Sequence, residues 1–364
     1  MLETCYEKAV ETLKACSTRH GLFASAGKKG YDAIWARDTV ISFLGGSLIE
    51  DKKLKETFKK SLILLAENQS ANGQIPNAVD KYSERPPHTD YKTIDSSLWY
   101  IIGHYIYKER YKTNSLFNQY KAAIEKALQW LRCQDPGEIG MLAQLPTSDW
   151  QDAFPHKYGY TINTQALYYK VLKLTKDPAS KKLKDRVNNN KDDKLWFSNF
   201  YIPYRWKNHN KYKEMGHWFD SLGNLLAINF DLADEYKAKK ILSYIKEKRI
   251  SRPYPIKVIS PPIKKNSKDW QDYYLDSGAG KPNSYANGGI WGFVGCFYVL
   301  ALIKYKKFKE AEKELKKIAE VNLKGNFPEW THPKTKRFYG KLQAWEAGMY
   351  ILAYRSLLEK KVLI

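Results

Sequence analysis

The sequence predicts an all-α fold, an (α/α)6 toroid in which six inner helices stand inside a ring of six outer helices. Three observations predict this fold. Helical periodicity dominates the chain, and no segment shows convincing strand alternation. Amphipathic helices alternate with helices that are apolar on nearly all sides. The connections between helices alternate in the same way, between long loops and turns of a few residues.

Twelve segments have helical periodicity, and they belong to two kinds. The odd-numbered segments are amphipathic; Phe308, Ala311, Leu315 and Ile318, for example, form one apolar stripe. The even-numbered segments are apolar nearly all round, as in GIWGFVGCFYVLALI, which predicts that they are buried. In chain order the segments are 3–17, 37–50, 53–69, 94–111, 115–132, 161–175, 178–198, 219–232, 235–248, 289–305, 308–322 and 343–358.

A long link follows each outer helix and a short turn follows each inner helix. Turns such as EDK (50–52) and TKD (175–177) make neighbouring helices antiparallel. All long loops must then emerge on one face, above the N-termini of the inner helices. No interdomain linker is recognisable, so we expect residues 1–364 to form one domain. The long loops are 18–36, 70–93, 133–160, 199–218, 249–288 and 323–342.

Composition and termini indicate a soluble globular protein, with 43% hydrophobic and 27% charged residues. The first sixteen residues, MLETCYEKAVETLKAC, lack the pattern of a signal peptide, and the longest apolar run is short for a membrane span. We therefore expect a cytoplasmic protein that does not bind a membrane. No cysteine or histidine spacing resembles a metal site, so we expect neither a metal nor a cofactor.

The net charge of +22 raises the alternative of a nucleic-acid or other anion-binding protein. In KKFKEAEKELKKIAE (306–320), however, acidic residues interleave with the lysines, as on a solvated helix face. No nucleic-acid-binding motif is present, so we expect no nucleic-acid partner. If the protein does bind nucleic acid, its affinity for DNA should fall steeply as the salt concentration rises. The oligomeric state stays open, and a homo-oligomer is possible.

Tryptophans gather at one end of the predicted barrel. Most of the eleven lie in the long loops or near the starts of inner helices; Trp130 and Trp196 lie elsewhere. Core packing alone would not concentrate tryptophan at one end, whereas a cleft that stacks against the apolar faces of sugars would. The loop face is therefore predicted to bind a small carbohydrate.

Glycoside hydrolysis needs two carboxyl groups, one protonated to assist the leaving group and one to activate water or attack carbon. The tetrapeptide DWQD occurs twice, at 149–152 and 269–272, but its flanks differ, so the copies are not an internal repeat. Residue chemistry alone does not choose among the carboxyl groups of the loop face, which are Asp38, Asp90, Asp95, Asp149, Asp152, Asp269, Asp272, Asp276 and Glu329, with Glu346 one helical turn further on.

Several stretches resemble, in the right order, motifs of known glycosidases. YDAIWARDTVIS (31–42), DWQDAFPHKYGYTINTQALYYKVL (149–172) and NFPEWTHPKTKRFYGKLQAWEAGMYILAY (326–354) are the most informative, and GQIPNAVD, TIDSSLWY and ANGGIWGFVGCFYVLALIK agree with them. They are similar to amylo-α-1,6-glucosidase-like glycogen debranching domains and to neutral/alkaline invertases. Both belong to the six-hairpin glycosidase superfamily, so the resemblance implies the same toroid.

The resemblance implies that Asp152 is the general acid and Glu329 the general base of an inverting hydrolase. We expect the apolar neighbours of Asp152 to raise its pKa, and the basic segment after Glu329 to hold that residue ionised. Asp149 is the alternative acid, and Glu346 is the alternative base.

Further residues match positions that hold sugar in the relatives. Arg37 and Asp38 match residues that bind the non-reducing-end sugar, although an Arg-Asp pair at a helix start could also be a capping device. For Asp269 and Trp270 we expect either cleft shaping or loop packing. The expected substrate-binding residues are Trp35, Arg37, Asp38, Asp95, Asp149, Trp150, Trp270, Trp291, Trp330, Gln343 and Trp345.

The chain departs from both groups of relatives. Asn163, within INTQAL, replaces a carboxylate of the invertases, and we expect no counterpart of the extra polymer-binding domains of debranching enzymes. We therefore expect an inverting hydrolase that cleaves an α-glucosidic bond in a small glycoside or at an α-glucan end. The alternatives are a sucrose-cleaving neutral invertase and, from another class, a catalytically inactive carbohydrate-binding protein.

Overall fold

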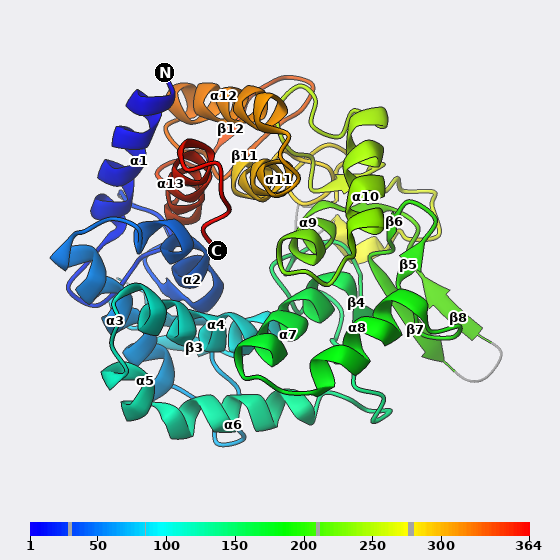
Figure 1. Cartoon of the computed structure of the whole chain (residues 1–364), viewed down its shortest axis with the longest axis horizontal. Helices are drawn as coiled ribbons and strands as arrows, with labels where there is room; N and C mark the ends of the chain where they lie inside the picture. The colour runs from blue at the N-terminus through cyan, green and yellow to red at the C-terminus, as the bar shows by residue number, and fades with distance from the viewer. Residues whose placement is uncertain (28–30, 84, 209–211, 276–279) are drawn as a thin grey trace.

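The computed structural model describes residues 1–27, 31–83, 85–208, 212–275 and 280–364. Six apolar helices form a closed inner ring, because each contacts the next and the last contacts the first (Figure 1). This confirms the predicted toroid. In chain order they are α2 (Ala36–Gly46), α4 (Asp95–Arg110), α7 (Ile162–Leu174), α9 (Ser221–Asn229), α11 (Gly292–Lys304) and α13 (Ala344–Leu358).

The amphipathic helices surround this ring, and two of them differ from the prediction. The helix expected over 115–132 is divided at Tyr120 into α5 and α6. The helix expected over 178–198 ends at Asn189, because Asn190 turns away and its side chain accepts from the backbone N–H groups of Asp192 and Asp193. The outer helices are α1 (Leu2–Cys16), α3 (Lys52–Glu67), α5 (Ser115–Gln119), α6 (Lys121–Arg132), α8 (Ala179–Asn189), α10 (Glu235–Glu247) and α12 (Phe308–Gly325).

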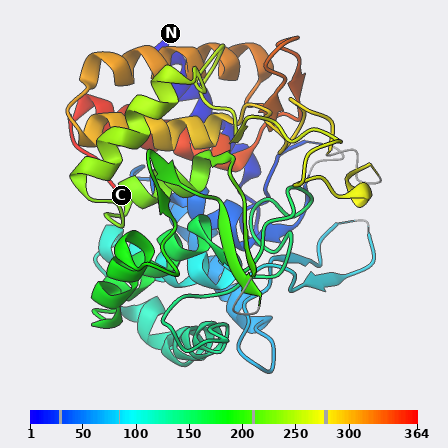
Figure 2. The same ribbon diagram turned by 90° about the vertical axis from the view of Figure 1, so that its right-hand side faces the viewer.

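The long loops carry short antiparallel strands, so the expectation of no strands is wrong. Most contain two or three residues, too few for an alternating pattern to show in the sequence. The loops project from one side of the barrel (Figure 2). The strands are β1 (Ile34–Trp35), β2 (Ala78–Asp80), β3 (His88–Asp90), β4 (Tyr160–Thr161), β5 (Trp196–Phe197), β6 (Phe200–Tyr201), β7 (Tyr204–Asn208), β8 (Tyr212–Met215), β9 (Phe219–Asp220), β10 (Ile259–Ser260), β11 (Trp330–Thr331) and β12 (Phe338–Tyr339).

Strand pairing ties loops that are distant in sequence to each other. In the sheet β1-β2-β3, Ile34 pairs with Val79 and Ala78 pairs with Asp90, which fixes the chain just before α2. The remaining sheets have the orders β4-β7-β8, β5-β6, β9-β10 and β11-β12. The 3-10 helix η1 (Asp272–Tyr274) lies in the loop before α11.

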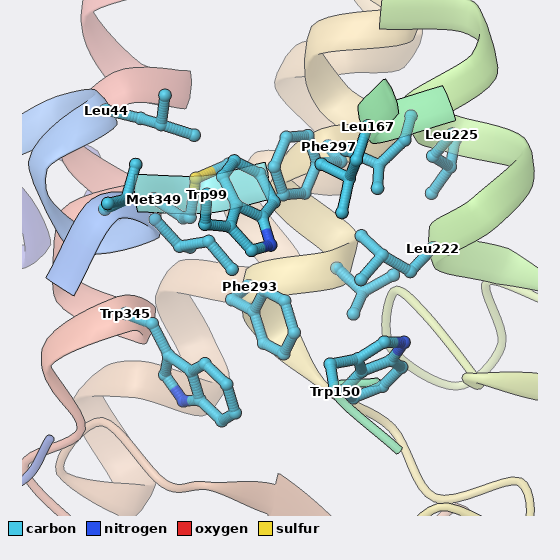
Figure 3. Close-up of a cluster of buried hydrophobic side chains, with 14 of the residues drawn as sticks. Leu44, Trp99, Trp150, Leu167, Leu222, Leu225, Phe293, Phe297, Trp345 and Met349 are labelled. Atoms are coloured by element: carbon cyan, nitrogen blue, oxygen red, sulfur yellow. The ribbon is translucent and has the colours of Figure 1, made fainter. Parts of the chain in front are cut away.

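The apolar core fills the inner ring. Leu44, Trp99, Leu167, Phe297 and Met349 come from five different inner helices and pack in one cluster (Figure 3). Burial of each such large side chain contributes roughly 1.5–3 kcal/mol. Figure 3 shows three further aromatic side chains, Trp150, Phe293 and Trp345, together at one end of this cluster.

The ring closes where the first and last inner helices touch backbone to backbone. A Cβ atom on Gly45 would lie 1.9 Å from the carbonyl oxygen of Gly348, and one on Gly348 would lie 2.1 Å from the carbonyl oxygen of Ser42. Only glycine permits this approach of α2 to α13. In the described part of the chain, no helix has the length and apolarity needed to span a membrane.

Candidate active site

A cavity of about 160 Å³ lies at the N-termini of inner helices, on the face that carries the long loops. Trp35, Trp291 and Gln343 are the N-cap residues of α2, α11 and α13, and all three line the cavity. The complete lining is Ala24, Tyr31, Trp35, Arg37, Asp38, Trp150, Asp152, Tyr285, Trp291, Glu329, Gln343 and Trp345.

The cavity brings together most of the residues predicted from the sequence. Both predicted catalytic groups, Asp152 and Glu329, are in its wall, although they come from loops far apart in the chain. Among the predicted substrate-binding residues, the wall contains Trp35, Arg37, Asp38, Trp150, Trp291, Gln343 and Trp345.

Arg37 connects two carboxylates from other segments. Its Nη1 lies 3.1 Å from Asp95 Oδ1, and its Nη2 lies 3.0 Å from Asp152 Oδ2. Asp95, which was predicted to contact sugar, is completely buried at the start of α4, outside the cavity lining, where it pairs with Arg37 from behind. Asp152 is 25% exposed and, within the aromatic wall, faces this guanidinium, a cation that its neighbours in the sequence did not reveal.

Glu329 carries a partly buried carboxyl group. Its pKa is raised to about 7, chiefly by burial and to a smaller extent by the nearby Asp38 and Asp152, although the Tyr31 hydroxyl, which donates to Oε1 at 3.3 Å, opposes the rise. The expectation that the basic segment after Glu329 would hold it ionised is therefore wrong. Asp38 behaves similarly, because burial raises its pKa to about 7 although Arg37 opposes the rise.

Tryptophans and tyrosines make up the rest of the wall. The ring of Trp291 lies 5.5 Å from that of Trp150 and 5.7 Å from that of Trp345, edge to face in both cases. Phe293 stacks on Trp345 at 4.4 Å and supports it from the core. Within the described residues, no acceptor reaches the buried indole nitrogens of Trp35, Trp150 and Trp345. The wall thus offers apolar aromatic faces together with the polar groups of Arg37, Asp38, Asp152 and Glu329, a combination suited to a polyhydroxyl ligand.

Asp149 lies behind the wall, where its carboxylate forms an ion pair of 2.9 Å with the fully buried Lys157. It also accepts hydrogen bonds from the amide nitrogen of Gln144 and the backbone N–H of Gln151. Asp149, predicted to contact the substrate, is thus engaged with protein groups outside the cavity lining. Glu346, the alternative base, is also outside the wall; it is buried against Gly292, and burial raises its pKa to about 8.

Two predicted tryptophans also lie outside the cavity wall. Trp270, in the second DWQD copy, packs edge to face on Tyr274 at 5.3 Å in a separate cluster, an arrangement that favours the packing alternative. Trp330 stacks on Tyr339 at 4.0 Å and contacts Tyr285 with its edge. Asp276, among the carboxyl candidates, lies outside the described residues.

Sequence reasoning did not single out three members of the wall, Ala24, Tyr31 and Tyr285. The two tyrosines lie in the predicted long loops 18–36 and 249–288, and the rule applied to tryptophan would have included them. Among the described residues, no three His, Cys, Asp or Glu side chains form a group that could hold a metal ion.

A ring of helix pairs that carries a carboxyl-lined aromatic cavity on its loop face is the architecture of six-hairpin glycosidases. The fold agrees with that of a GH63 mannosylglycerate hydrolase from Thermus thermophilus solved with glucose, at a TM-score of 0.72 and 13% identity over 95% of this chain and 99% of that one. A rhamnosidase from Klebsiella oxytoca solved with rhamnose agrees at a TM-score of 0.69 and 13% identity over 97% of this chain and 63% of that one.

Sequence comparison gives the family. The family model of amylo-alpha-1,6-glucosidase matches residues 8–351, and the chain belongs to this glycoside hydrolase family. Alkaline/neutral invertase C, mitochondrial, from Arabidopsis thaliana is 31% identical over 149 residues, 39% of this chain and 22% of the relative. Neutral/alkaline invertase 1, mitochondrial, from Oryza sativa subsp. japonica is 32% identical over 140 residues, 36% of this chain and 22% of the relative. These matches span about a fifth of each relative.

Proposed function

We propose that this protein hydrolyses an α-glucosidic bond in a small glycoside, or at the end of an α-glucan, with inversion at the anomeric carbon. The observation that carries the proposal is the meeting of Asp152 and Glu329, from two separate loops, in one aromatic cavity. The cavity of about 160 Å³ is smaller than the ~300–1,000 Å³ of pockets for drug-sized ligands, which favours a single sugar unit as its occupant.

In the proposed mechanism, Asp152 protonates the glycosidic oxygen while Glu329 removes a proton from the attacking water. Arg37 and Asp38 hold sugar hydroxyl groups, and the tryptophans pack against the ring. Inversion requires room for water between the two carboxyl groups, which lie ~6.5–9.5 Å apart in inverting enzymes. The product is released as the opposite anomer.

One observation favours an exchange of the two roles. Burial raises the pKa of Glu329 to about 7, whereas Asp152 accepts a hydrogen bond from the cationic Arg37. In the unliganded protein, Glu329 is thus the better-placed proton donor. We keep Asp152 as the acid because it matches the position of the acid in the related enzymes, and a direct test is available.

Hydrolysis of sucrose, trehalose, maltose, isomaltose and kojibiose, followed by NMR of the first-formed anomer, tests the substrate class and the stereochemistry. Asp152→Asn and Glu329→Gln should each lower kcat/KM by about 10²-fold or more, the usual contribution of a general acid or base. Asp272→Asn, in the second DWQD copy and exposed, is the matched control and should leave activity unchanged. Retention of configuration, or full activity in both site variants, would contradict the proposal.

α-Glucosyl fluoride assigns the roles, because fluoride leaves with little need for an acid. If Asp152 is the acid, Asp152→Asn should lose activity on a disaccharide but keep most of its activity on the fluoride. Glu329→Gln, without the base, should lose activity on both. The opposite pattern would assign the acid to Glu329.

The similarity to the plant invertases favours sucrose cleavage as the second candidate function. Turnover of sucrose alone in the panel would establish it. A catalytically inactive carbohydrate-binding protein would bind members of the panel and release no product.

A further inference from the structure

A second cavity, of about 560 Å³, lies beside the segment that carries Asp152, and the described residues that line it are different from those of the candidate active site. Its volume falls within the ~300–1,000 Å³ of ordinary ligand pockets. Four aromatic side chains, Tyr91, Trp130, Tyr158 and Trp206, reach it from four different segments. Trp130, which the sequence placed away from the tryptophan-rich end, thus has a place in this wall.

The wall has little charge and offers acceptors for hydroxyl groups. Of the described residues in it, none has a carboxylate, and Lys92 is the one charged side chain. Gln74 and Gln134 both donate their amide N–H groups to backbone carbonyls. No donor among the described residues reaches their amide oxygens, which are thus available as acceptors for hydroxyl groups.

A glycine fixes one aromatic face of this cavity. Gly159 has φ +68°, and a Cβ atom at this position would lie 2.7 Å from Cε3 of Trp206. The indole of Trp206 therefore packs directly on the backbone of residue 159, in a position that a side chain there would deny. The aromatic wall is consequently preorganised.

We propose that this cavity is a second carbohydrate-binding site, which takes a neutral oligosaccharide. The test is calorimetric titration of the full-length Glu329→Gln protein with maltoheptaose. Two binding events are expected, and Trp130→Ala with Trp206→Ala should remove one of them or weaken it about tenfold or more. Trp196→Ala, on β5 at the outside of the barrel, is the control and should bind like the parent.

A single binding event that the two substitutions leave unchanged would overturn the second site, and so would the absence of maltoheptaose binding. Because this readout is binding, its failure differs from a failure of the proposed function, which would be an absence of turnover.

Lys157 supports a second, independent inference. Its side chain is fully buried, and its ammonium lies 2.9 Å from Asp149 and 2.9 Å from Asp220, which are also fully buried. It also donates to the amide oxygen of Gln151 at 2.6 Å. A buried ammonium is costly to desolvate, and two carboxylates and an amide oxygen compensate for that cost here.

These contacts fasten the loop of Asp152 to an inner helix. Asp149 and Gln151 belong to the same DWQD tetrapeptide as Asp152. Asp220 is the N-cap of α9, where its other carboxylate oxygen accepts from the backbone N–H of Gly223 at 3.1 Å. The position of Asp152 therefore depends on a cation that does not itself line the cavity.

We infer that Lys157 is a positioning residue for the general acid, an inference that depends on the proposed function. Displacement of a catalytic group by about 1 Å can cost ~10²-fold in rate. Lys157→Met should therefore lower kcat on the disaccharide that is the best substrate about 10²-fold, with a much smaller effect on α-glucosyl fluoride. General destabilisation would instead lower both rates equally.

Two further variants keep this test decisive. The single variant Lys157→Met leaves two buried carboxylates without the lysine that pairs with them, whereas the double variant Lys157→Met/Asp149→Asn leaves one. The double variant should therefore fold more readily and show the same selective loss of activity on the disaccharide. Lys237→Met, which removes a lysine paired with Asp234 on the outer helix α10, is the matched control and should not affect either rate. Equal losses on both substrates would overturn the role of Lys157. No turnover by the parent protein would instead count against the proposed function.

Discussion

Nη2 of Arg37 lies 3.0 Å from Oδ2 of Asp152, although the two residues are 115 positions apart in the chain. Arg37 belongs to the first turn of α2 and is almost completely buried. Its other terminal nitrogen is held by Asp95 of α4. The orientation of the proposed acid is thus linked to the inner ring through one guanidinium.

Arg37→Met should destabilise the protein and abolish activity. The substitution leaves the fully buried Asp95 without the guanidinium that pairs with it. Removal of one partner of a buried ion pair typically lowers the free energy of unfolding by ~3–5 kcal/mol. Urea unfolding measures this loss, and adding Asp95→Asn should restore part of the stability. Arg355→Met is the control, since its pair with Glu359 is exposed and is expected to contribute about 0–1 kcal/mol. Similar losses for the two arginines would contradict the importance of burial.

The pH dependence of kcat/KM should report the ionisation of Glu329. As a base this residue must be ionised, and burial raises its pKa to about 7. Activity of the free enzyme should therefore rise about tenfold per pH unit below 7 and level off above. A rate that instead falls as the pH rises through 7 would indicate that Glu329 donates a proton.

Glu346→Gln should increase stability at alkaline pH relative to the parent. Burial raises the pKa of Glu346 from 4.5 to about 8 in the folded protein. A carboxyl group whose pKa is raised in the folded protein binds its proton more tightly there than in the unfolded chain. Its full contribution to the free energy of unfolding is therefore present below the unfolded pKa of 4.5 and is lost as the pH rises from 4.5 toward 8. The amide does not titrate, so the Tm difference between variant and parent should grow in favour of the variant from about pH 5 to about pH 9. A difference that does not change with pH would contradict the prediction.

Gly45→Ala should destabilise the protein far more than Gly46→Ala, its neighbour in α2. A Cβ atom at residue 45 meets the backbone of α13, whereas one at residue 46 meets the ends of the Leu13 and Phe43 side chains, which can move. Overpacking typically costs ~1–3 kcal/mol, against a gain of roughly 0.5–1 kcal/mol from replacing glycine in a helix. Chemical denaturation of both variants measures the difference, and equal stabilities would argue against close contact of the two helices.

The sequence was sufficient to predict the helical ring, since alternating periodicities and loop lengths are local signals. It also predicted several residues of the cavity wall from motifs, among them Arg37 and Glu329, although Asp95 and Trp330, which motifs also carried, lie outside the wall. It could not distinguish Asp149 from Asp152, because which side chain of a loop faces the cavity depends on tertiary contacts. For Asp149 the decisive contact is the fully buried Lys157, which also pairs with Asp220 from another part of the chain. The prediction that Glu329 is held ionised failed for the same reason, since burial, and not the neighbouring basic residues, controls the pKa of this carboxyl group.

The contact of Gly45 with Gly348 has a consequence for synthesis of the protein on the ribosome. Arg37 and Asp38 are translated more than 300 residues before Gln343 and Trp345, which line the same cavity. Until α13 emerges and docks on α2, the nascent chain is an open arc with exposed apolar inner helices. Such a chain is prone to aggregation, and a ribosome-bound fragment that stops before residue 343 should be unable to form the site.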